Sequence, residues 1–291
     1  MKMRTTSSRL EGGAARAPRR AAESAAAAPV AARASAESRP TARAPGSAKY
    51  VYGVVRARRG SQPKGTGIDG KRLRVVSSKG IGALTSDVPA GQLEAGREEL
   101  LTHSRVLEQA LEQGVVLPMR FGVVMPDDSA IRAELLDPHR DDLEAQLEEM
   151  SGKVEFNVKA IYDEQAVLRE VLADNGQIAR LRDAVSGMPE DAAYYERIQL
   201  GELVAQALAQ KQAADEEAII ARLSPHALGV EVGGAMHERM AVNASFLVEE
   251  DRLGAFDRAL DEVAAENRDR LRFKATGPLP PHSFVELTLE A

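Results

Sequence analysis

Few side chains in this sequence have the types and spacing that catalysis or metal binding requires. The 291 residues include five histidines and no cysteine, which excludes disulfides, thiolate zinc sites, iron–sulfur clusters and cysteine nucleophiles. His226 and His237 are separated by a predicted strand and lack further ligands at matching spacing, and no serine lies in a nucleophile elbow. The sequence therefore predicts no catalytic residue, no metal site and no cofactor, and we expect a protein that is not an enzyme.

His103 is the histidine with the most informative surroundings. It shares a helical stripe with Leu100, Leu107 and Leu111, so we expect it on the buried face of a helix. A single histidine on such a stripe is usually a core residue that is hydrogen-bonded through a ring nitrogen. A functional role for His103 is the alternative.

A glycine pattern could bind a nucleotide. Gly65, Gly67 and Gly70 form G-x-G-x-x-G, a fingerprint that requires a strand before it and a helix after it. A strand is predicted at 73–76 instead, so the loop amides would not converge at a helix N-terminus, and we expect no nucleotide binding. The acidic pairs Asp127-Asp128 and Asp141-Asp142 stand where helix N-termini favour negative charge, which is a structural role.

Charge is distributed unevenly along the chain. The net charge is −6, but residues 1–48 contain eight Arg and one Lys against three Glu, a net charge of +6 that leaves −12 for the remainder. An acidic body argues against a nucleic-acid partner, because phosphate contacts need a basic face. No apolar run approaches the roughly 20 residues that cross a bilayer, so no membrane partner is expected either.

Residues 1–48 are rich in Ala, Arg, Ser, Pro and Gly. Such a segment cannot bury enough apolar surface to offset the entropy of ordering, so we predict a disordered tail. Its Arg-rich, acid-poor composition also suits an organelle transit peptide, which is the alternative.

The first predicted domain covers residues 49–150. Strands are expected at 50–56, 73–77 and 81–87, with a hinge between the last two at Lys79-Gly80. A helix is expected from Pro89 to about Gln113, then a strand at 115–124 that contains Pro118, then acidic helices to Met150.

The second predicted domain covers residues 151–291. Strands are expected at 153–162, 227–232, 239–249 and 271–276, with a helical arm at 163–224 and a helix after Asp251. The arm has heptad-like spacing that is typical of a coiled coil or helical hairpin. This β-α-β-β-α-β order is that of a ferredoxin-like sheet. Gly277-Pro278 should end the last strand, and Val285, Leu287 and Leu289 predict an extra C-terminal strand. We therefore predict an α+β protein with two domains, the second ferredoxin-like with an enlarged helical crossover.

Two blocks of sequence resemble the signature blocks of the GvpL/GvpF gas vesicle protein family. The first block is GVVLPMRFG at 114–122, and the second is TGPLPPHSFV at 276–285. YVYGVV at 50–55, GIDG at 67–70 and NASFLVEEDRLGAF at 243–256 follow the family's order as well. Leu279 and His282 depart from the pattern, because the family usually has an aromatic residue at the first position and often a Tyr at the second.

The resemblance implies a non-enzymatic accessory protein of gas vesicle assembly, in the cytoplasm and at the gas vesicle. Its implied partners are the small hydrophobic shell protein and other gas vesicle proteins. Edge strands and apolar grooves are the usual means of covering such an apolar subunit. The candidate partner-binding residues are those of the two blocks: Leu117, Pro118, Arg120, Phe121, Gly277, Pro278, Pro280, Pro281 and Phe284.

Two alternatives stay open. The prolines and glycines of the blocks could serve only the backbone geometry of the fold. The protein could also be a ferredoxin-like module that binds a small ligand, or an enzyme of unrecognised type. A pocket with convergent polar groups around His103 or Arg120 would favour this second class.

Overall fold

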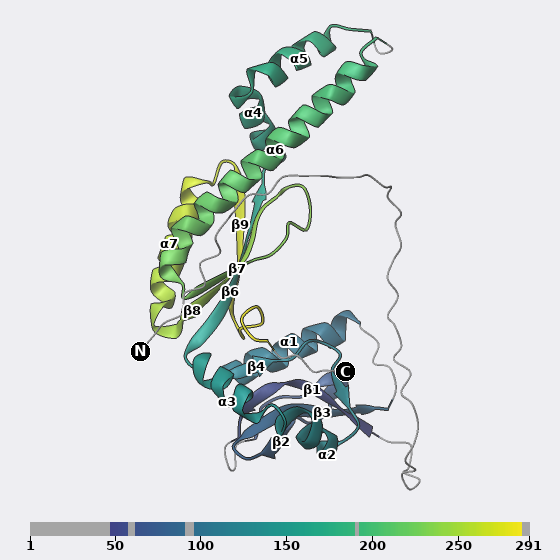
Figure 1. The fold of residues 1–291 in the computed structure, drawn as a ribbon, viewed down its shortest axis with the longest axis vertical. Coiled ribbons are helices and arrows are strands. Elements are labelled where there is room, and N and C mark those ends of the chain that lie inside the picture. Colours follow the sequence, from purple (N-terminus) through teal and green to yellow (C-terminus); the bar gives the residue numbers. More distant parts are fainter. Residues whose placement is uncertain (1–46, 58–61, 91–95, 190–191, 287–291) are drawn as a thin grey trace, which may run out of the picture. The chain divides into compact units, whose positions relative to one another are not determined.

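The computed structural model describes residues 47–57, 62–90, 96–189 and 192–286. Two antiparallel sheets carry the fold (Figure 1). Both lie within one compact unit. The predicted division between domains near residues 150–152 stays a prediction.

The N-terminal sheet contains β1 (Ser47–Arg56), β2 (Arg74–Ser78), β3 (Ile81–Pro89) and β4 (Val116–Pro118) in the order β2-β3-β1-β4, and β5 (Val124–Met125) also pairs with β1. The hinge predicted at Lys79-Gly80 is confirmed, because both residues have positive φ angles, of 43° and 102°. The predicted strand at 115–124 is instead two short strands, β4 and β5, since Pro118 ends the first of them.

Helices cover both faces of this sheet. They are the short 3-10 turn η1 (Ile68–Gly70), α1 (Arg97–Leu111), α2 (Asp128–Ala130), the π-helical turn η2 (Ile131–Leu136) and α3 (Arg140–Glu149). The prediction that a helix starts at Pro89 was wrong, because β3 continues through Pro89 and α1 begins at Arg97. The role predicted for Asp127 is confirmed: its carboxylate caps α2 by accepting from the backbone N–H groups of Ser129 and Ala130.

The C-terminal sheet contains β6 (Lys153–Tyr162), β7 (Gly229–Val232), β8 (Met240–Glu249) and β9 (Leu271–Leu279) in the order β7-β8-β6-β9. The short turns η3 (Ser224–His226) and η4 (Glu250–Arg252) precede β7 and α7 (Leu253–Glu266). Phe246 of β8 and Phe256 of α7 are fully buried, with ring centroids 5.4 Å apart. Alternating apolar residues of β6 and β8 thus form a core against α7.

The predicted helical arm is present as α4 (Glu164–Asp174), α5 (Gly176–Ser186) and α6 (Tyr194–Leu223). Helix α6 has 30 residues, which is about 45 Å of α-helix. Its C-terminal end enters the core of the C-terminal sheet through Ile219 and Leu223. Its N-terminal half runs beside α5 at the end of the arm distant from the sheet (Figure 1).

The predictions for the two ends of the chain need correction. Strand β1 starts at Ser47, so the last two residues of the predicted tail belong to the sheet, and residues 1–46 lie outside the described part. Strand β9 does not end at Gly277-Pro278 but continues to Leu279 across a cis peptide bond. The predicted extra strand is absent at Val285 and Glu286, and its remaining residues, 287–291, lie outside the described part.

Within the described ranges, no helix combines the length and the apolar character that a membrane span requires.

Candidate functional site

The first block surrounds His103. The side chains of Tyr50, in β1, and His103, in α1, are hydrogen-bonded, with Tyr50 Oη 2.9 Å from His103 Nδ1. The other ring nitrogen, Nε2, is 3.2 Å from the carbonyl oxygen of Met119. The ring of Phe121 lies 5.7 Å from the His103 ring, edge to face, and the backbone N–H of Gly122 donates to Tyr50 Oη over 3.1 Å. Residues of the first block therefore hold His103 from two sides.

These contacts determine the protonation state of His103. A carbonyl oxygen can only accept, so Nε2 must carry the proton and donate to Met119, which leaves Nδ1 as the acceptor for the Tyr50 hydroxyl. Burial, together with the charge of the nearby His282, lowers the pKa of His103 to about 4, so the ring is neutral at pH 7. Burial also raises the pKa of the Tyr50 hydroxyl above its usual value. His103 is thus a neutral side chain with both nitrogens hydrogen-bonded, which is the structural role predicted for it.

The second block crosses from β9 to the N-terminal sheet. Phe284 and Val285 are half-buried against the core that contains Val51, Leu117 and Leu143. The side-chain amide of Gln146, in α3, donates to the carbonyl oxygen of Glu286 over 3.3 Å. Because Leu117 and Met119 of the first block belong to the core that Phe284 packs against, the two blocks approach each other at the N-terminal sheet.

A buried carboxylate fixes the second block. Glu155 of β6 is only 4% exposed and accepts hydrogen bonds from the backbone N–H of Ser283 over 2.7 Å and from its hydroxyl over 2.9 Å. The Ser283 hydroxyl is also 3.0 Å from that of Ser245. These bonds explain why no strand forms at Val285, since the block bonds to side chains instead of a strand ladder. Gly277 is required as well, because a Cβ there would lie 2.7 Å from the Phe156 ring.

The candidate partner-binding residues differ in their exposure. Leu117, Pro118, Pro280 and Pro281 are buried, and Phe121 and Phe284 are half-buried. Arg120, Gly277 and Pro278 are exposed. Arg120 makes no ion pair with any residue that the structure describes. The exposed candidates are therefore Arg120 of the first block and Gly277-Pro278 of β9, whereas three of the four prolines are buried.

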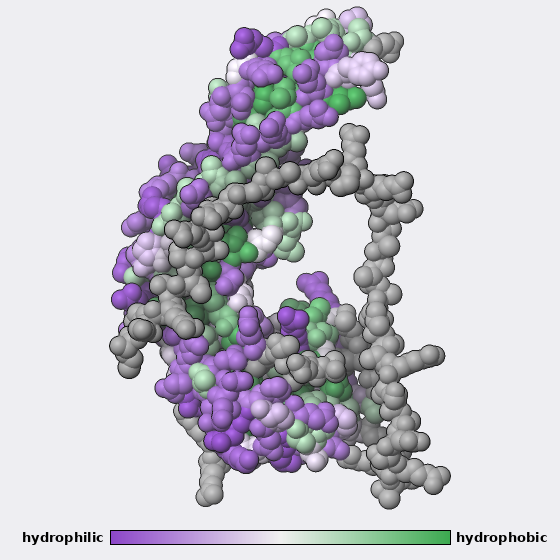
Figure 2. Space-filling model, in the orientation of Figure 1, coloured by the Kyte–Doolittle hydropathy of each residue, from purple (hydrophilic) through white to green (hydrophobic). Residues whose placement is uncertain are grey.

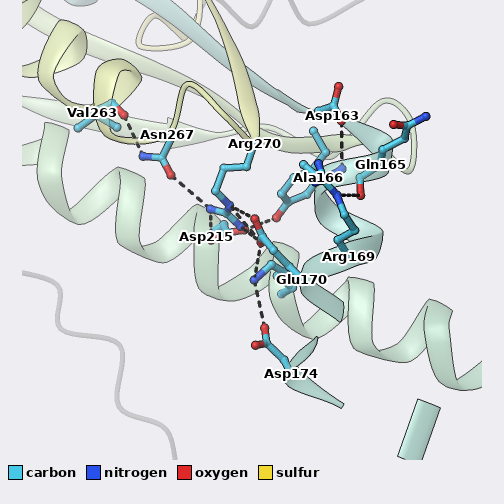
Figure 3. A network of polar contacts seen from close by, with 12 residues as sticks. Asp163, Gln165, Ala166, Arg169, Glu170, Asp174, Asp215, Val263, Asn267 and Arg270 are labelled. Atoms are coloured by element: carbon cyan, nitrogen blue, oxygen red, sulfur yellow. Dashed lines mark hydrogen bonds and ion pairs between the residues drawn. The ribbon is translucent and has the colours of Figure 1, made fainter. Parts of the chain in front are cut away.

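A charged network at the base of the arm was not predicted from the sequence. Figure 3 shows the guanidinium of Arg270, which precedes β9, between the carboxylates of Glu170 in α4 and Asp215 in α6. Its nitrogens lie 2.9 Å from Glu170 Oε1 and 2.6 Å from Asp215 Oδ2. Lys211 adds a contact of 2.8 Å to Glu170, and the Tyr162 hydroxyl donates to Asp215. One arginine thus links the sheet with two helices of the arm.

Electrostatics favours the ionised form of this network. Burial alone would raise the pKa values of Glu170 and Asp215, but hydrogen bonds from Arg270 outweigh it and lower both. The hydrogen bond to Asp215 raises the pKa of Arg270. The sequence signal was weak, because Arg270 lies 100 residues from Glu170 and 55 from Asp215, and no helical spacing relates the three positions.

The arm also exposes apolar and aromatic side chains. Figure 2 shows hydrophobic side chains among hydrophilic ones on the arm. Near the turn between α5 and α6, Tyr194 and Tyr195 are 62% and 80% exposed, with rings 5.4 Å apart, and Met188 and Ile198 are exposed as well. A surface of this kind suits protein contacts, in which tyrosines are enriched.

The glycine loop has no geometry for a nucleotide. The turn η1 has three residues and is followed by β2, so no helix N-terminus faces a phosphate. The backbone N–H of Ile68 donates to Tyr52 Oη over 2.8 Å, and a Cβ at Gly67 would lie 2.2 Å from that oxygen. Among the residues described here, no group of His, Asp and Glu is arranged to hold a metal ion.

Fold and site together define a mixed α/β protein with two antiparallel sheets, whose residues of interest form packing and ion-pair networks. The sequence profile described as "Gas vesicle synthesis protein GvpL/GvpF" matches residues 48–286. The chain therefore belongs to the GvpL/GvpF family of gas vesicle synthesis proteins.

Individual relatives support this family membership. The chain is 40% identical over 240 residues to gas vesicle protein F of Streptomyces sp., a match that covers 81% of this chain and 99% of the relative. It is 29% identical to gas vesicle protein F of Dolichospermum flosaquae, covering 82% and 97%.

Two crystal structures show the same fold. The gas vesicle protein GvpF from Anabaena sp. superimposes with a TM-score of 0.71 at 24% identity, covering 84% of this chain and 98% of that one. GvpF from Microcystis aeruginosa gives a TM-score of 0.66 at 24% identity, covering 82% and 99%.

Proposed function

We propose that this protein is a non-enzymatic accessory factor of gas vesicle assembly that binds the small hydrophobic shell protein and other gas vesicle proteins. It acts either as an assembly factor or as a minor structural component, in the cytoplasm and at the gas vesicle. Family membership supports the process. The observation that carries the binding role is the position of β9 at the edge of its sheet, with Arg272 and Lys274 to Pro278 exposed.

An exposed edge strand suits an apolar, polymerising partner. Its unpaired backbone groups can accept a further strand, and its side chains then select the partner. Arg272 and Lys274 on β9 oppose unspecific pairing of the edge, because charged side chains discourage aggregation there. We propose Arg120 as a second, separate contact because it is exposed, makes no ion pair with the described residues, and belongs to the first block.

We also propose that the C-terminal part is a separate, ferredoxin-like domain. The β-α-β-β-α-β order of the C-terminal part and the strand order β7-β8-β6-β9 support a ferredoxin-like sheet with the arm in its first crossover. The turn at Ser151-Gly152, where Gly152 has a φ of 69°, supports a domain boundary there.

The alternative function, binding of a small ligand around His103 or Arg120, has less support. Two cavities, of about 560 and 510 Å³, open in the described part of the chain, and neither is lined by His103 or Arg120. His103 has no hydrogen-bonding nitrogen left for a ligand.

The test is co-purification of the shell protein with matched variants. Ala275→Glu places a carboxylate on the exposed part of β9, whereas Ala213→Glu makes the same change on an exposed position of α6. We expect Ala275→Glu and Arg120→Ala to retain about tenfold less shell protein than the parent, and Ala213→Glu to retain as much as the parent. Circular dichroism should show all three folded. Undiminished retention by both test variants would refute binding at β9 and at Arg120.

A further inference from the structure

The basic residues of the folded part are concentrated in one segment. From Lys49 to Gly80 the sequence has nine Lys or Arg and one Asp, a net charge of +8. From Ile81 to Ala291 it has twenty Lys or Arg against forty Asp or Glu, a net charge of −20. A segment that opposes the sign of the remaining chain this strongly produces a local positive field.

Most of the cations that the structure describes in this segment make no ion pair. Lys49 pairs with Asp87 over 2.5 Å, and Arg56 pairs with Glu148. Arg72 donates to the side-chain oxygen of Gln62 over 2.6 Å. Within the described ranges, four exposed side chains of this segment make no ion pair: Lys64, Lys71, Arg74 and Lys79. Unpaired surface cations are available to an anionic partner.

A cavity opens beside these cations. It has a volume of about 560 Å³ and lies between the end of β1, the β2–β3 turn and the C-terminal end of α1. Its charged lining residues are both cations, Arg56 and Lys79. Ser77 and Gln113 add polar groups, and the apolar wall consists of Val55, Val75, Leu84, Ala110 and Val115. The cavity therefore suits an apolar group that has negative charge beside it.

A protein segment fits this combination better than a nucleic acid does. Single-stranded nucleic acids bind through exposed aromatic side chains on which bases stack. In the described part of the N-terminal sheet and its helices, Tyr50 and Tyr52 are fully buried and Phe121 is half-buried, so no exposed ring offers such a surface. A phosphate backbone would also leave the apolar wall of the cavity without a partner.

We propose that this basic cavity is a docking site for an acidic protein segment, which inserts one apolar side chain between Val75 and Ala110 and places a carboxylate on Lys79. The occupant is a segment of another protein. The site is independent of the surface at β9, and the loss of either would leave the other intact.

The experiment measures fluorescence anisotropy of a fluorescein-labelled oligoglutamate peptide with one central leucine. The parent protein should bind it, and replacing the leucine by glycine should weaken binding about tenfold. Lys79→Glu should weaken it about tenfold through like charge, and Gln113→Trp should do so by filling the cavity from an exposed position. Arg258→Glu, the same charge change on an exposed position of α7, is the matched control and should bind like the parent.

Several results would overturn the proposal. Equal binding by the parent and by both test variants would exclude the cavity. If a single-stranded oligothymidylate of equal charge bound more tightly than the peptide, the partner would be a nucleic acid and not a protein. Self-association of the parent in sedimentation velocity that disappears in Lys79→Glu would make the occupant a second copy of this chain.

Discussion

The His103 cluster and the Arg270 network both join segments that are distant in sequence, but they use different chemistry. The His103 cluster is buried and neutral, and each of its hydrogen bonds has a defined donor and acceptor. The Arg270 network is ionic and partly open to solvent, with side-chain exposures of 21% for Arg270 and 30% for Glu170. Neutral buried bonds do not depend on salt, whereas exposed ion pairs are screened by it.

The locations of the two networks match this difference. The His103 cluster holds the first sequence block against β1 and α1, where a fixed geometry shapes the fold. The Arg270 network holds a helical arm whose far end exposes tyrosines. We expect the arm attachment to respond to salt and the His103 cluster to resist it, and the following experiments test this contrast.

Replacing His103 should have the largest effect. His103→Leu keeps roughly the volume of the side chain, but it leaves the proton of the buried Tyr50 hydroxyl without an acceptor and the Met119 carbonyl without its donor. We expect a loss of about 3 kcal/mol in the free energy of unfolding, from two unsatisfied groups. Urea denaturation measures it, with His237→Leu at an exposed position as the control. Equal stability of the two variants would contradict the structural role assigned to His103.

The pH dependence of stability should also reveal the contribution of His103. The pKa of His103 is about 4 in the folded protein and near 6.5 in an unfolded chain, so the unfolded state binds more protons between these values. Stability should be complete above pH 6.5 and fall by up to about 3 kcal/mol as the pH drops to 4. The difference between parent and His103→Leu in urea denaturation at each pH isolates this contribution. A constant difference across that range would contradict the assignment.

Replacing Arg270 should have a smaller, salt-dependent effect. Arg270→Met removes the cation that compensates the negative charges of Glu170 and Asp215, although Lys211 remains beside Glu170. After discounting for solvent exposure, we expect a loss of about 2 kcal/mol at low salt. The loss should shrink in about 1 M NaCl and as the pH falls through the lowered pKa values of the two carboxylates. Arg258→Met is the control, and a salt-independent loss would mean that Arg270 acts mainly by packing.

Changing the end of the arm should have the smallest effect on stability. Tyr195 is 80% exposed, so Tyr195→Ser should change the free energy of unfolding by less than about 0.5 kcal/mol. Differential scanning calorimetry can compare it with Tyr50→Ser, which removes a fully buried ring. A large loss from Tyr195→Ser would show that the exposed tyrosines stabilise the arm.

Local sequence patterns were sufficient to predict much of the fold. Alternating apolar residues predicted β6 and β8, and Lys79-Gly80 predicted a turn that the structure contains. The helical arm followed from apolar spacing and from proline positions. These features depend on neighbours within a few residues, and such neighbours are visible in the sequence.

Side-chain partners across long sequence separations were decided by the tertiary structure alone. Arg270 meets Glu170 and Asp215, and Glu155 meets Ser283, only because β6 and β9 lie side by side and the chain then turns across the sheet. The burial of Pro280 and Pro281 likewise depends on where the second block goes after β9. The sequence by itself determined the charge distribution, the family resemblance and most of the elements, but not the start of α1 or the division of 115–124 into β4 and β5. The pairing of distant charges and the exposed part of each block required the folded chain, because no local period relates residues that meet only after folding.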